Sequence, residues 1–307
     1  MKDNIKFIDL QVNGYAGIDF NSMILTEEQL LVACKKLEED NVEGILATLI
    51  TDDFNKMIDK IKNITSIIEG NDYIKSIIKG IHIEGPFLNS NDGYRGAHQR
   101  EFIIPPDLEM AKQMFDSANG LIKLFTLAPE CDDNFSVTKF LSKNNVLVSA
   151  GHSDASLDQL NEAIDSGLKL YTHLGNGSPS FLPRHDNIVN RVLSLAGKIS
   201  ICFISDGIHI PTFVLKNYLN AAGMDNCIIV TDCMSAASAP PGIYSVSHIS
   251  VEVGEDKIVR QIGKDNLAGS AITMKETEKI LSEQIGLSNS NIRKIMYENA
   301  QILLGRK

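Results

Sequence analysis

The stretch KGIHIEGP, Lys79–Pro86, is a short apolar run that leads to the carboxylate of Glu84 and is followed by a Gly-Pro turn. Three further runs carry, at or near their ends, a residue that can bind or assist a metal ion: VLVSAGH with His152, LKLYTHL with His173 and CIIVTD with Asp232. Short apolar, β-rich runs are typical of buried parallel strands. Polar residues at the carboxyl ends of such strands carry the chemistry of (β/α)8 barrel enzymes. These four runs therefore predict the fold and the site together.

Strand-like and helix-like segments alternate along the sequence on both sides of these runs. Eight segments are expected to be strands: residues 7–12, 43–50, 76–84, 121–129, 146–152, 168–174, 199–206 and 227–232. Amphipathic segments with helix-capping residues lie between them, most clearly at 26–40, 52–68, 155–167 and 211–223. Eight β/α repeats predict an α/β protein with a closed parallel (β/α)8 TIM barrel, not an open doubly wound sheet.

The pattern changes after Asp232. Residues 242–263 are expected to form a small β-hairpin inserted after the eighth strand, with Gly254 near its turn. Two helices, predicted at 273–286 and 288–305, then complete the chain. Since no linker, low-complexity tract or repeat divides the sequence, residues 1–307 are expected to form a single catalytic barrel domain of the metal-dependent hydrolase type.

Composition limits the partners and the cell compartment. The chain has 307 residues, of which 43% are hydrophobic and 22% charged, as is ordinary for a folded domain. Its formal net charge of -10 argues against a nucleic-acid partner, which would need a basic surface. No apolar stretch approaches the roughly 20 residues that span a membrane, and no signal-peptide core is seen at the start. Five cysteines, an odd number without metal-ligand spacing, are expected to be reduced thiols in a cytoplasmic protein.

One carboxylate and two imidazoles, from Glu84, His152 and His173, make a ligand set that suits zinc and related divalent ions. Taken singly, each histidine is more often a hydrogen-bonded structural residue, and a glutamate before a turn is often only solvated. Their matching positions near strand ends favour a shared metal instead. Three protein ligands leave one coordination position open for water, which is the catalytic arrangement.

Further candidates lie on the same face of the predicted barrel. Asp232 can take a proton from water at the metal and pass it to a leaving group, although it can also be a helix cap or a structural anchor. His209 follows the seventh strand, where it can reach a substrate, and Asp206 shapes that loop. His98 and Arg184 lie on long loops, where exposed residues usually have no specific role.

Nine stretches, in order along nearly the whole chain, resemble the N-acetylglucosamine-6-phosphate deacetylases of the amidohydrolase superfamily: FIDLQVNG, HIEGPF, GAH, TLAPE, SAGHS, THLGNG, SDGIH, VTD and LAGSAITM. The resemblance implies hydrolysis of the N-acetyl amide of an amino sugar, most directly N-acetylglucosamine-6-phosphate, to glucosamine-6-phosphate and acetate. It also implies a homodimer, in which a neighbouring subunit can supply residues to the phosphate pocket.

The resemblance assigns roles residue by residue. It implies metal ligation by Glu84, His152 and His173, and proton transfer by Asp232 as general base and then acid. His98 would polarise the amide carbonyl and support the oxyanion. Contacts to the sugar and its phosphate are implied for four residues: Asn176, Gly177, His209 and Arg184.

Gln11 and Asn13 stand where many amidohydrolases have a His-x-His metal pair, and single-metal members of the family have the same Gln-x-Asn. One divalent metal ion is therefore expected, zinc in the first place, with iron, cobalt and manganese as alternatives.

Three departures from the family narrow these implications. The family's small β-sandwich, built from both termini, is expected to be absent because the first barrel strand begins by Phe7. The usual Asn-Ala-Met after the sixth strand is Asn-Gly-Ser at residues 176–178, preceded by Gly175, and the loop around Arg184 is more polar than usual. Since the last two changes fall on the sugar and phosphate side, the reaction is better defined than the substrate.

Two alternatives stay open from the sequence. One is the same amidohydrolase chemistry on a different N-acyl or cyclic amide, which the altered loops favour. The other is a non-catalytic sugar-binding barrel, which predicts lost ligands. Against it, all four strand-end residues are present: Glu84, His152, His173 and Asp232.

Overall fold

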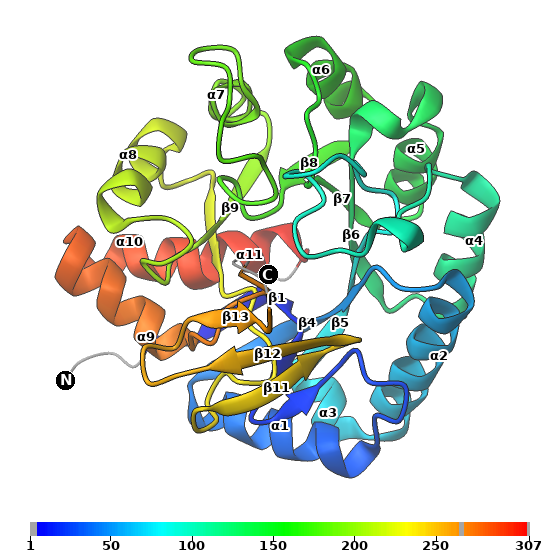
Figure 1. The fold of residues 1–307 in the computed structure, drawn as a ribbon, viewed down its shortest axis with the longest axis vertical. Coiled ribbons are helices and arrows are strands. Elements are labelled where there is room, and N and C mark those ends of the chain that lie inside the picture. The colour runs from blue at the N-terminus through cyan, green and yellow to red at the C-terminus, as the bar shows by residue number, and fades with distance from the viewer. Residues whose placement is uncertain (1–4, 264–266, 306–307) are drawn as a thin grey trace.

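Eight parallel strands enclose the centre of the molecule in the computed structural model, which describes residues 5–263 and 267–305 (Figure 1). They pair in chain order: β1 (Phe7–Val12), β4 (Val42–Ile50), β5 (Ile78–Glu84), β6 (Ile122–Leu127), β7 (Leu147–Ala150), β8 (Leu168–Tyr171), β9 (Ser200–Ile204) and β10 (Cys227–Val230). Thr231 ties β10 back to β1, since its backbone N–H and its hydroxyl both donate to the carboxylate of Asp9. The predicted (β/α)8 barrel is confirmed. The ends of the predicted 1–307 domain, and residues 264–266 within it, lie outside the described residues.

Three of the strands that carry the predicted site residues end earlier than the sequence predicts. β7 stops at Ala150, β8 at Tyr171 and β10 at Val230. The next site residue on each has a left-handed backbone, with φ of 51° at His152, 33° at His173 and 50° at Asp232. This conformation is costly for a residue with a side chain, so it persists only where the surrounding structure holds it. Glu84, by contrast, is the last residue of β5.

Helices cover the outside of the barrel. The α-helices between strands are α1 (Glu27–Glu39), α2 (Phe54–Gly70), α3 (Asp72–Ile77), α4 (Leu108–Ser117), α5 (Ser136–Lys143), α6 (Leu157–Asp165), α7 (Ile188–Leu193) and α8 (Thr212–Ala222). Three short 3-10 helices are η1 (Arg100–Phe102), η2 (Pro129–Cys131) and η3 (Asp133–Phe135). Reciprocal caps begin two of the predicted helices, Thr26 with Gln29 at α1 and Ser156 with Gln159 at α6.

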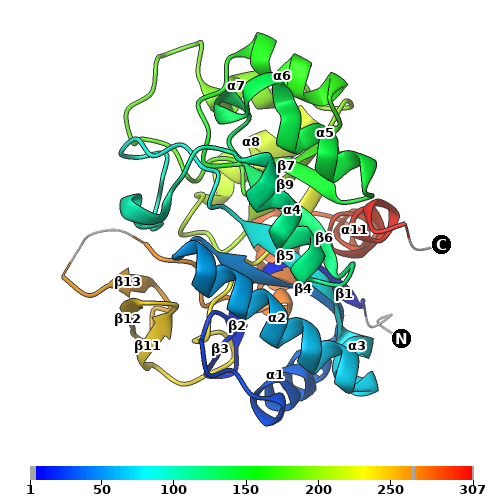
Figure 2. The same ribbon diagram turned by 90° about the vertical axis from the view of Figure 1, so that its right-hand side faces the viewer.

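A small antiparallel sheet lies at the carboxyl ends of the barrel strands (Figure 2). It consists of β11 (Gly242–Val246), β12 (Ile249–Val253) and β13 (Val259–Gln261). A hairpin is confirmed after the eighth barrel strand, but the region has three strands and two turns. The turn predicted near Gly254 joins β12 to β13, while β11 and β12 are joined at Ser247 and His248. Ser247 ties its first turn to the barrel by donating its backbone N–H to Asp19 and its hydroxyl to Asp52, which pairs with the buried Lys60 at 2.6 Å. A short hairpin of β2 (Gly14–Tyr15) and β3 (Ile18–Asp19) follows β1.

The last helix, α11 (Asn299–Leu303), lies at the opposite end of the barrel (Figure 2). Of the two predicted C-terminal helices, the first is α9 (Met274–Lys279) continued by the π-helix η4 (Ile280–Ile285), and the second is α10 (Asn289–Arg293), the π-helix η5 (Lys294–Glu298) and α11. Asn299 donates to the backbone carbonyls of Met224 and Cys227 and so joins α11 to the start of β10. No helix in the described part of the chain is both long and apolar enough to cross a membrane.

The inside of the barrel changes from apolar to polar toward the carboxyl ends of the strands. Buried aliphatic side chains fill the lower part: Ile8, Leu10, Leu46, Leu124, Leu170 and Ile228. Above them, a chain of buried polar contacts runs from Thr48 through His82, Thr126 and Thr172 to Ser149. Burial lowers the pKa of His82 to about 4, so its ring is neutral at physiological pH. This polar layer is the floor beneath the strand-end residues.

Candidate active site

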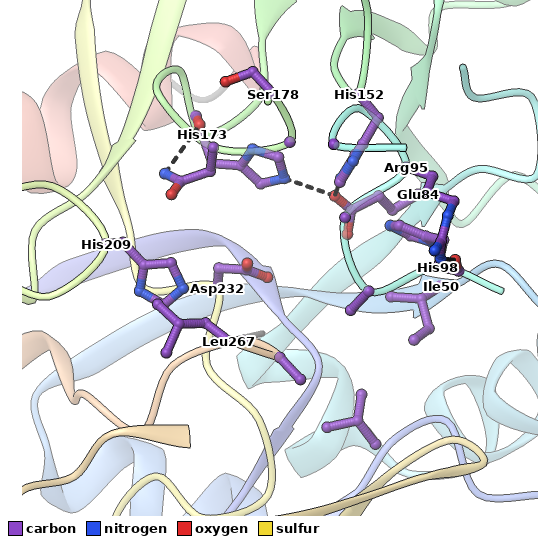
Figure 3. Close-up of a pocket in the computed structure, with 18 of the residues that line it drawn as sticks. Ile50, Glu84, Arg95, His98, His152, His173, Ser178, His209, Asp232 and Leu267 are labelled. Atoms are coloured by element: carbon purple, nitrogen blue, oxygen red, sulfur yellow. Dashed lines mark hydrogen bonds and ion pairs between the residues drawn. The ribbon is translucent and has the colours of Figure 1, made fainter. Parts of the chain in front are cut away.

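A cavity of about 600 Å3 opens at the carboxyl ends of the barrel strands (Figure 3). Most of the site residues predicted from the sequence line it: Glu84, His98, His152, His173, Asn176, Gly177, His209 and Asp232. Arg184 is exposed on the loop after β8, and it is not among the described residues that line the cavity. The fold thus brings the predicted metal and proton-transfer residues together and leaves the predicted phosphate-binding arginine outside.

Two histidines converge on one carboxylate oxygen. Nε2 of His173 lies 2.9 Å and Nε2 of His152 lies 3.2 Å from Oε1 of Glu84, and all three side chains are buried (Figure 3). Burial raises the pKa of Glu84, but its contacts with the two histidines outweigh burial and hold that pKa well below its ordinary value. Burial lowers the pKa of His173, but the contact with Glu84 raises it overall. The negative charge of Glu84 and a positive charge on His173 therefore stabilise each other.

The protonation of His152 is fixed by the backbone. Its Nδ1 lies 2.7 Å from the carbonyl oxygen of Tyr94, and a carbonyl only accepts, so Nδ1 carries a proton. In the neutral ring, Nε2 then presents a lone pair to the carboxylate of Glu84. Two groups with lone pairs repel each other, so this arrangement needs a cation or a further proton between them.

Two glycines allow the chain to approach the His152 ring closely. A Cβ added at Gly177 would lie 2.7 Å from Nδ1 of His152, and one added at Gly96 would lie 3.0 Å from Cε1. Both glycines also have a positive φ, 59° and 55°, which residues with side chains rarely adopt. A side chain at either position would therefore strain the backbone and press on the ring.

The residues present fit a divalent metal ion. Ligand atoms of Glu84, His98 and His152 all lie within 4.8 Å of one another. Nε2 of His173 approaches the same Glu84 oxygen, and its Nδ1 is buried without a hydrogen-bond partner among the described residues. A carboxylate with several imidazole nitrogens is a set that suits zinc and neighbouring ions. His98 stands beside the predicted ligands, its ring centroid 4.5 Å from that of His152.

Asp232 is held at the cavity by two side-chain amides. Nε2 of Gln11 donates to its Oδ1 at 2.9 Å, and Nδ2 of Asn13 donates to the same atom at 2.8 Å. Burial, and then the negative charge of Glu84, raises the pKa of Asp232 to about 6. A carboxyl group with a pKa near neutrality can both accept and return a proton at physiological pH. In the sequence, Gln11 and Asn13 were notable only for the metal ligands that they replace.

His209 is oriented by its own loop. Its Nδ1 lies 2.6 Å from Oδ2 of Asp206, while the backbone N–H groups of Ile208 and His209 donate to Oδ1. Burial raises the pKa of Asp206, but its contact with His209 outweighs burial and lowers it. Asp206 is thus the anchor of this loop, and the His209 ring lines the cavity near Asp232 (Figure 3).

Sequence reasoning missed two features of the cavity. Arg95 is the one lysine or arginine among the described lining residues; it donates from Nε to Asp92 at 3.0 Å and from Nη1 to the carbonyl of His98 at 3.1 Å. One part of the wall is apolar, formed by Ile50, Met234, Val246, Ile249, Leu267 and Ala268. The only signal in the sequence for Arg95 is its position directly before the Gly-Ala-His stretch. The apolar part of the wall could not be predicted, because it depends on how the inserted sheet packs over the barrel.

Known proteins resemble the chain in sequence and in structure. No family model matches it. A curated N-acetylglucosamine-6-phosphate deacetylase from Bacillus subtilis is 31% identical over 300 residues, which cover 97% of this chain and 74% of the relative. The enzyme of the same name from Lysinibacillus sphaericus is 30% identical over 298 residues, or 96% of this chain and 74% of the relative.

Solved structures agree with these relatives. The N-acetylglucosamine-6-phosphate deacetylase from Pasteurella multocida superposes with a TM-score of 0.87 and 28% identity, over 98% of this chain and 76% of that one. A variant of the Mycobacterium smegmatis enzyme, in complex with N-acetyl-D-glucosamine-6-phosphate, has the same fold, with a TM-score of 0.89, 24% identity, and coverage of 98% and 77%. The chain therefore belongs to the N-acetylglucosamine-6-phosphate deacetylase family of hydrolases.

Proposed function

We propose that the protein hydrolyses the N-acetyl amide of an amino sugar, in the first place N-acetylglucosamine-6-phosphate, to the free amine and acetate. The observation that carries this proposal is the convergence of His152 and His173 on one oxygen of Glu84. Membership of the deacetylase family supports the choice of substrate.

Glu84, His152 and His173 would hold one divalent metal ion, zinc in the first place, with iron, cobalt or manganese as alternatives. The lone pair that His152 presents to a carboxylate supports this assignment. When bound at such a site, a divalent ion polarises an amide carbonyl and acidifies water. Elemental analysis of the purified protein tests both the number of ions and their identity.

Asp232 would be the proton carrier. Its carboxylate takes a proton from the attacking water while the water oxygen forms a bond to the acyl carbon. The carbon–nitrogen bond then breaks as Asp232 returns this proton to the nitrogen, which restores the carboxylate. The amine and acetic acid leave, and the acid loses its remaining proton to water or to the amine, giving acetate. Gln11 and Asn13 support this role, because they donate to the ionised form of Asp232.

The remaining predicted residues would bind the substrate. His98 would donate to the carbonyl oxygen, where negative charge develops. Asn176, Gly177 and His209 would contact the sugar, since all three line the cavity. Arg184 would bind the phosphate from the loop that also carries Asn176 and Gly177, beyond the cavity lining.

A second candidate is the same hydrolysis of a different N-acyl or cyclic amide. Two observations favour it: Arg184 lies outside the cavity lining, and part of the cavity wall is apolar. An apolar wall suits a larger acyl group better than it suits a sugar phosphate.

A substrate panel separates the two candidates. Release of the free amine would be measured with N-acetylglucosamine, with its 6-phosphate and with N-acyl analogues of increasing chain length. The main proposal predicts the highest kcat/KM for the acetylated 6-phosphate. Indifference to the phosphate, together with a preference for a longer acyl group, would support the second candidate.

We also propose that the protein acts as a homodimer in the cytoplasm, without a nucleic-acid or membrane partner. The family resemblance motivates the dimer, and the net charge of -10 argues against nucleic acid. Light scattering on the active protein tests the assembly, and an active monomer would exclude it.

A further inference from the structure

We propose that Thr51 is a positioning residue that fixes the tautomer of His98 by donating its hydroxyl proton to Nδ1. Nε2 of His98 then carries the single proton of the neutral ring and presents a donor to the substrate carbonyl. The inference rests on the proposed function for the identity of that carbonyl, but the tautomer itself can be measured without any substrate.

The contact between the two residues is short and shielded from water. Oγ1 of Thr51 lies 2.9 Å from Nδ1 of His98, and both residues are buried. Thr51 directly follows β4, while His98 comes from the long loop between β5 and α4. His98 lines the cavity, and Nε2 is the ring nitrogen that the contact with Thr51 leaves available to a substrate there.

The backbone of His98 is also fixed. Its N–H donates to the carbonyl of Arg95 at 3.1 Å, and Nη1 of Arg95 donates back to the carbonyl of His98 at 3.1 Å. The ring of His98 is buried, and burial favours the neutral form of an imidazole. A neutral imidazole carries one proton, which must be on either Nδ1 or Nε2.

The hydroxyl of Thr51 has a single proton and two acceptors within reach. It lies 2.9 Å from Nδ1 of His98 and 3.3 Å from the backbone carbonyl of Glu84. If the proton goes to His98, Nε2–H is the donor on the cavity side. If it goes to Glu84, Nδ1 of His98 must donate to Thr51, and Nε2 presents a lone pair that suits a metal ligand.

Two observations favour the first arrangement. The contact with His98 is the shorter of the two. Glu84, His152 and His173 already provide three convergent ligand atoms, so a fourth imidazole lone pair is not needed for the metal.

Nitrogen-15 NMR of the zinc-loaded and the metal-free protein tests the proposal, with the His98 ring signals assigned by their loss in His98→Gln. We expect a protonated, pyrrole-type Nε2 and an unprotonated Nδ1 in both forms of the wild type. A protonated Nδ1, or an Nε2 signal that shifts as a metal ligand on zinc loading, would overturn the proposal. Because this result needs no turnover, it stands apart from failure of the proposed deacetylation.

Variants of Thr51 add the functional readout. Thr51→Val removes the hydroxyl at nearly constant shape, and we expect the His98 tautomer to become mixed and kcat to fall about tenfold to a hundredfold with little change in KM. Thr51→Ser keeps the hydroxyl and should retain both the tautomer and kcat. A Thr51→Val variant that loses kcat but keeps the wild-type tautomer would show that Thr51 has only a packing role and would overturn the proposal.

Discussion

Glu84 and Asp232 are joined through a single nitrogen atom. Nε2 of Gln11 lies 3.1 Å from Oε2 of Glu84 and 2.9 Å from Oδ1 of Asp232. The amide therefore donates to both carboxylates at the cavity, one beside the two histidines and one suited to proton transfer. This bridge sets the distance between Glu84, a proposed metal ligand, and Asp232, the proposed proton carrier. It also reduces the repulsion between the negative charges of these two buried carboxylates.

Asn13 should control the pH dependence of the reaction through Asp232. Its donated hydrogen bond lowers the pKa of Asp232, so Asn13→Leu should raise that pKa. Since Asp232 must be ionised to accept a proton, the acid limb of kcat/KM should move upward by about one pH unit. A pH profile of wild type and variant at equal metal content measures the shift. If the acid limb of kcat/KM does not move, a group other than Asp232 controls it.

Gly177 should be required for metal binding, although it offers no ligand. In Gly177→Ala, the new Cβ would meet Nδ1 of His152 at 2.7 Å and displace the ring. We expect the dissociation constant for zinc to rise about tenfold to a hundredfold, as measured by competition with a chelator. Gly197→Ala is the matched control, because Gly197 also has a positive φ but nothing lies within 4 Å of its added Cβ. Equal losses in both variants would point to backbone strain rather than to His152.

Asp9 should make the protein less stable as the pH rises. Burial raises its pKa from 3.8 to about 7, so between these values the folded state binds more protons than the unfolded chain. Stability from this group is therefore present at low pH and is lost between about pH 4 and pH 7. Relative to Asp9→Asn, the wild type should lose about 2–3 kcal/mol of unfolding free energy from about pH 5 to about pH 8. Urea denaturation measures this difference, and a difference that is constant with pH would contradict the assignment.

Arg184 should distinguish phosphorylated from unphosphorylated substrates. If it pairs with the phosphate, Arg184→Ala should raise KM for N-acetylglucosamine-6-phosphate about tenfold or more, since a hydrogen bond to a charged group contributes about 1.5–3 kcal/mol. The unphosphorylated sugar is the internal control and should be unaffected. Arg95→Ala in parallel tests the arginine that does line the cavity. If only Arg95→Ala raises KM for the phosphorylated substrate, Arg95 and not Arg184 binds the phosphate.

The barrel and the set of cavity residues could be predicted because both follow from local patterns. Apolar runs such as Cys227–Val230 identify strands, and a polar residue just beyond each run identifies the mouth of the barrel. The exact strand ends could not be predicted, because they depend on the left-handed backbone at His152, His173 and Asp232. That conformation is imposed by neighbouring loops and not by the residue types themselves.

Contacts between segments that are distant in the sequence could not be predicted either. Nothing in the sequence around Gln11 indicates that its amide meets carboxylates from β5 and from the end of β10. Thr51 next to Ile50 has the pattern of an ordinary strand end, yet it contacts His98 in the loop that follows the neighbouring strand β5. The family resemblance supplied roles for Arg184 and His98, but only the fold shows that one is exposed and the other buried.

The measurement that tests the central claim most directly is acetate release from N-acetylglucosamine-6-phosphate by the metal-loaded wild type and by Asp232→Asn at matched metal content. The account predicts steady turnover by the wild type and a loss of about 100-fold to 10,000-fold in kcat for the variant, because the amide cannot take the proton from water. Near-normal turnover by metal-loaded Asp232→Asn, or no acetate from the metal-loaded wild type, would contradict it.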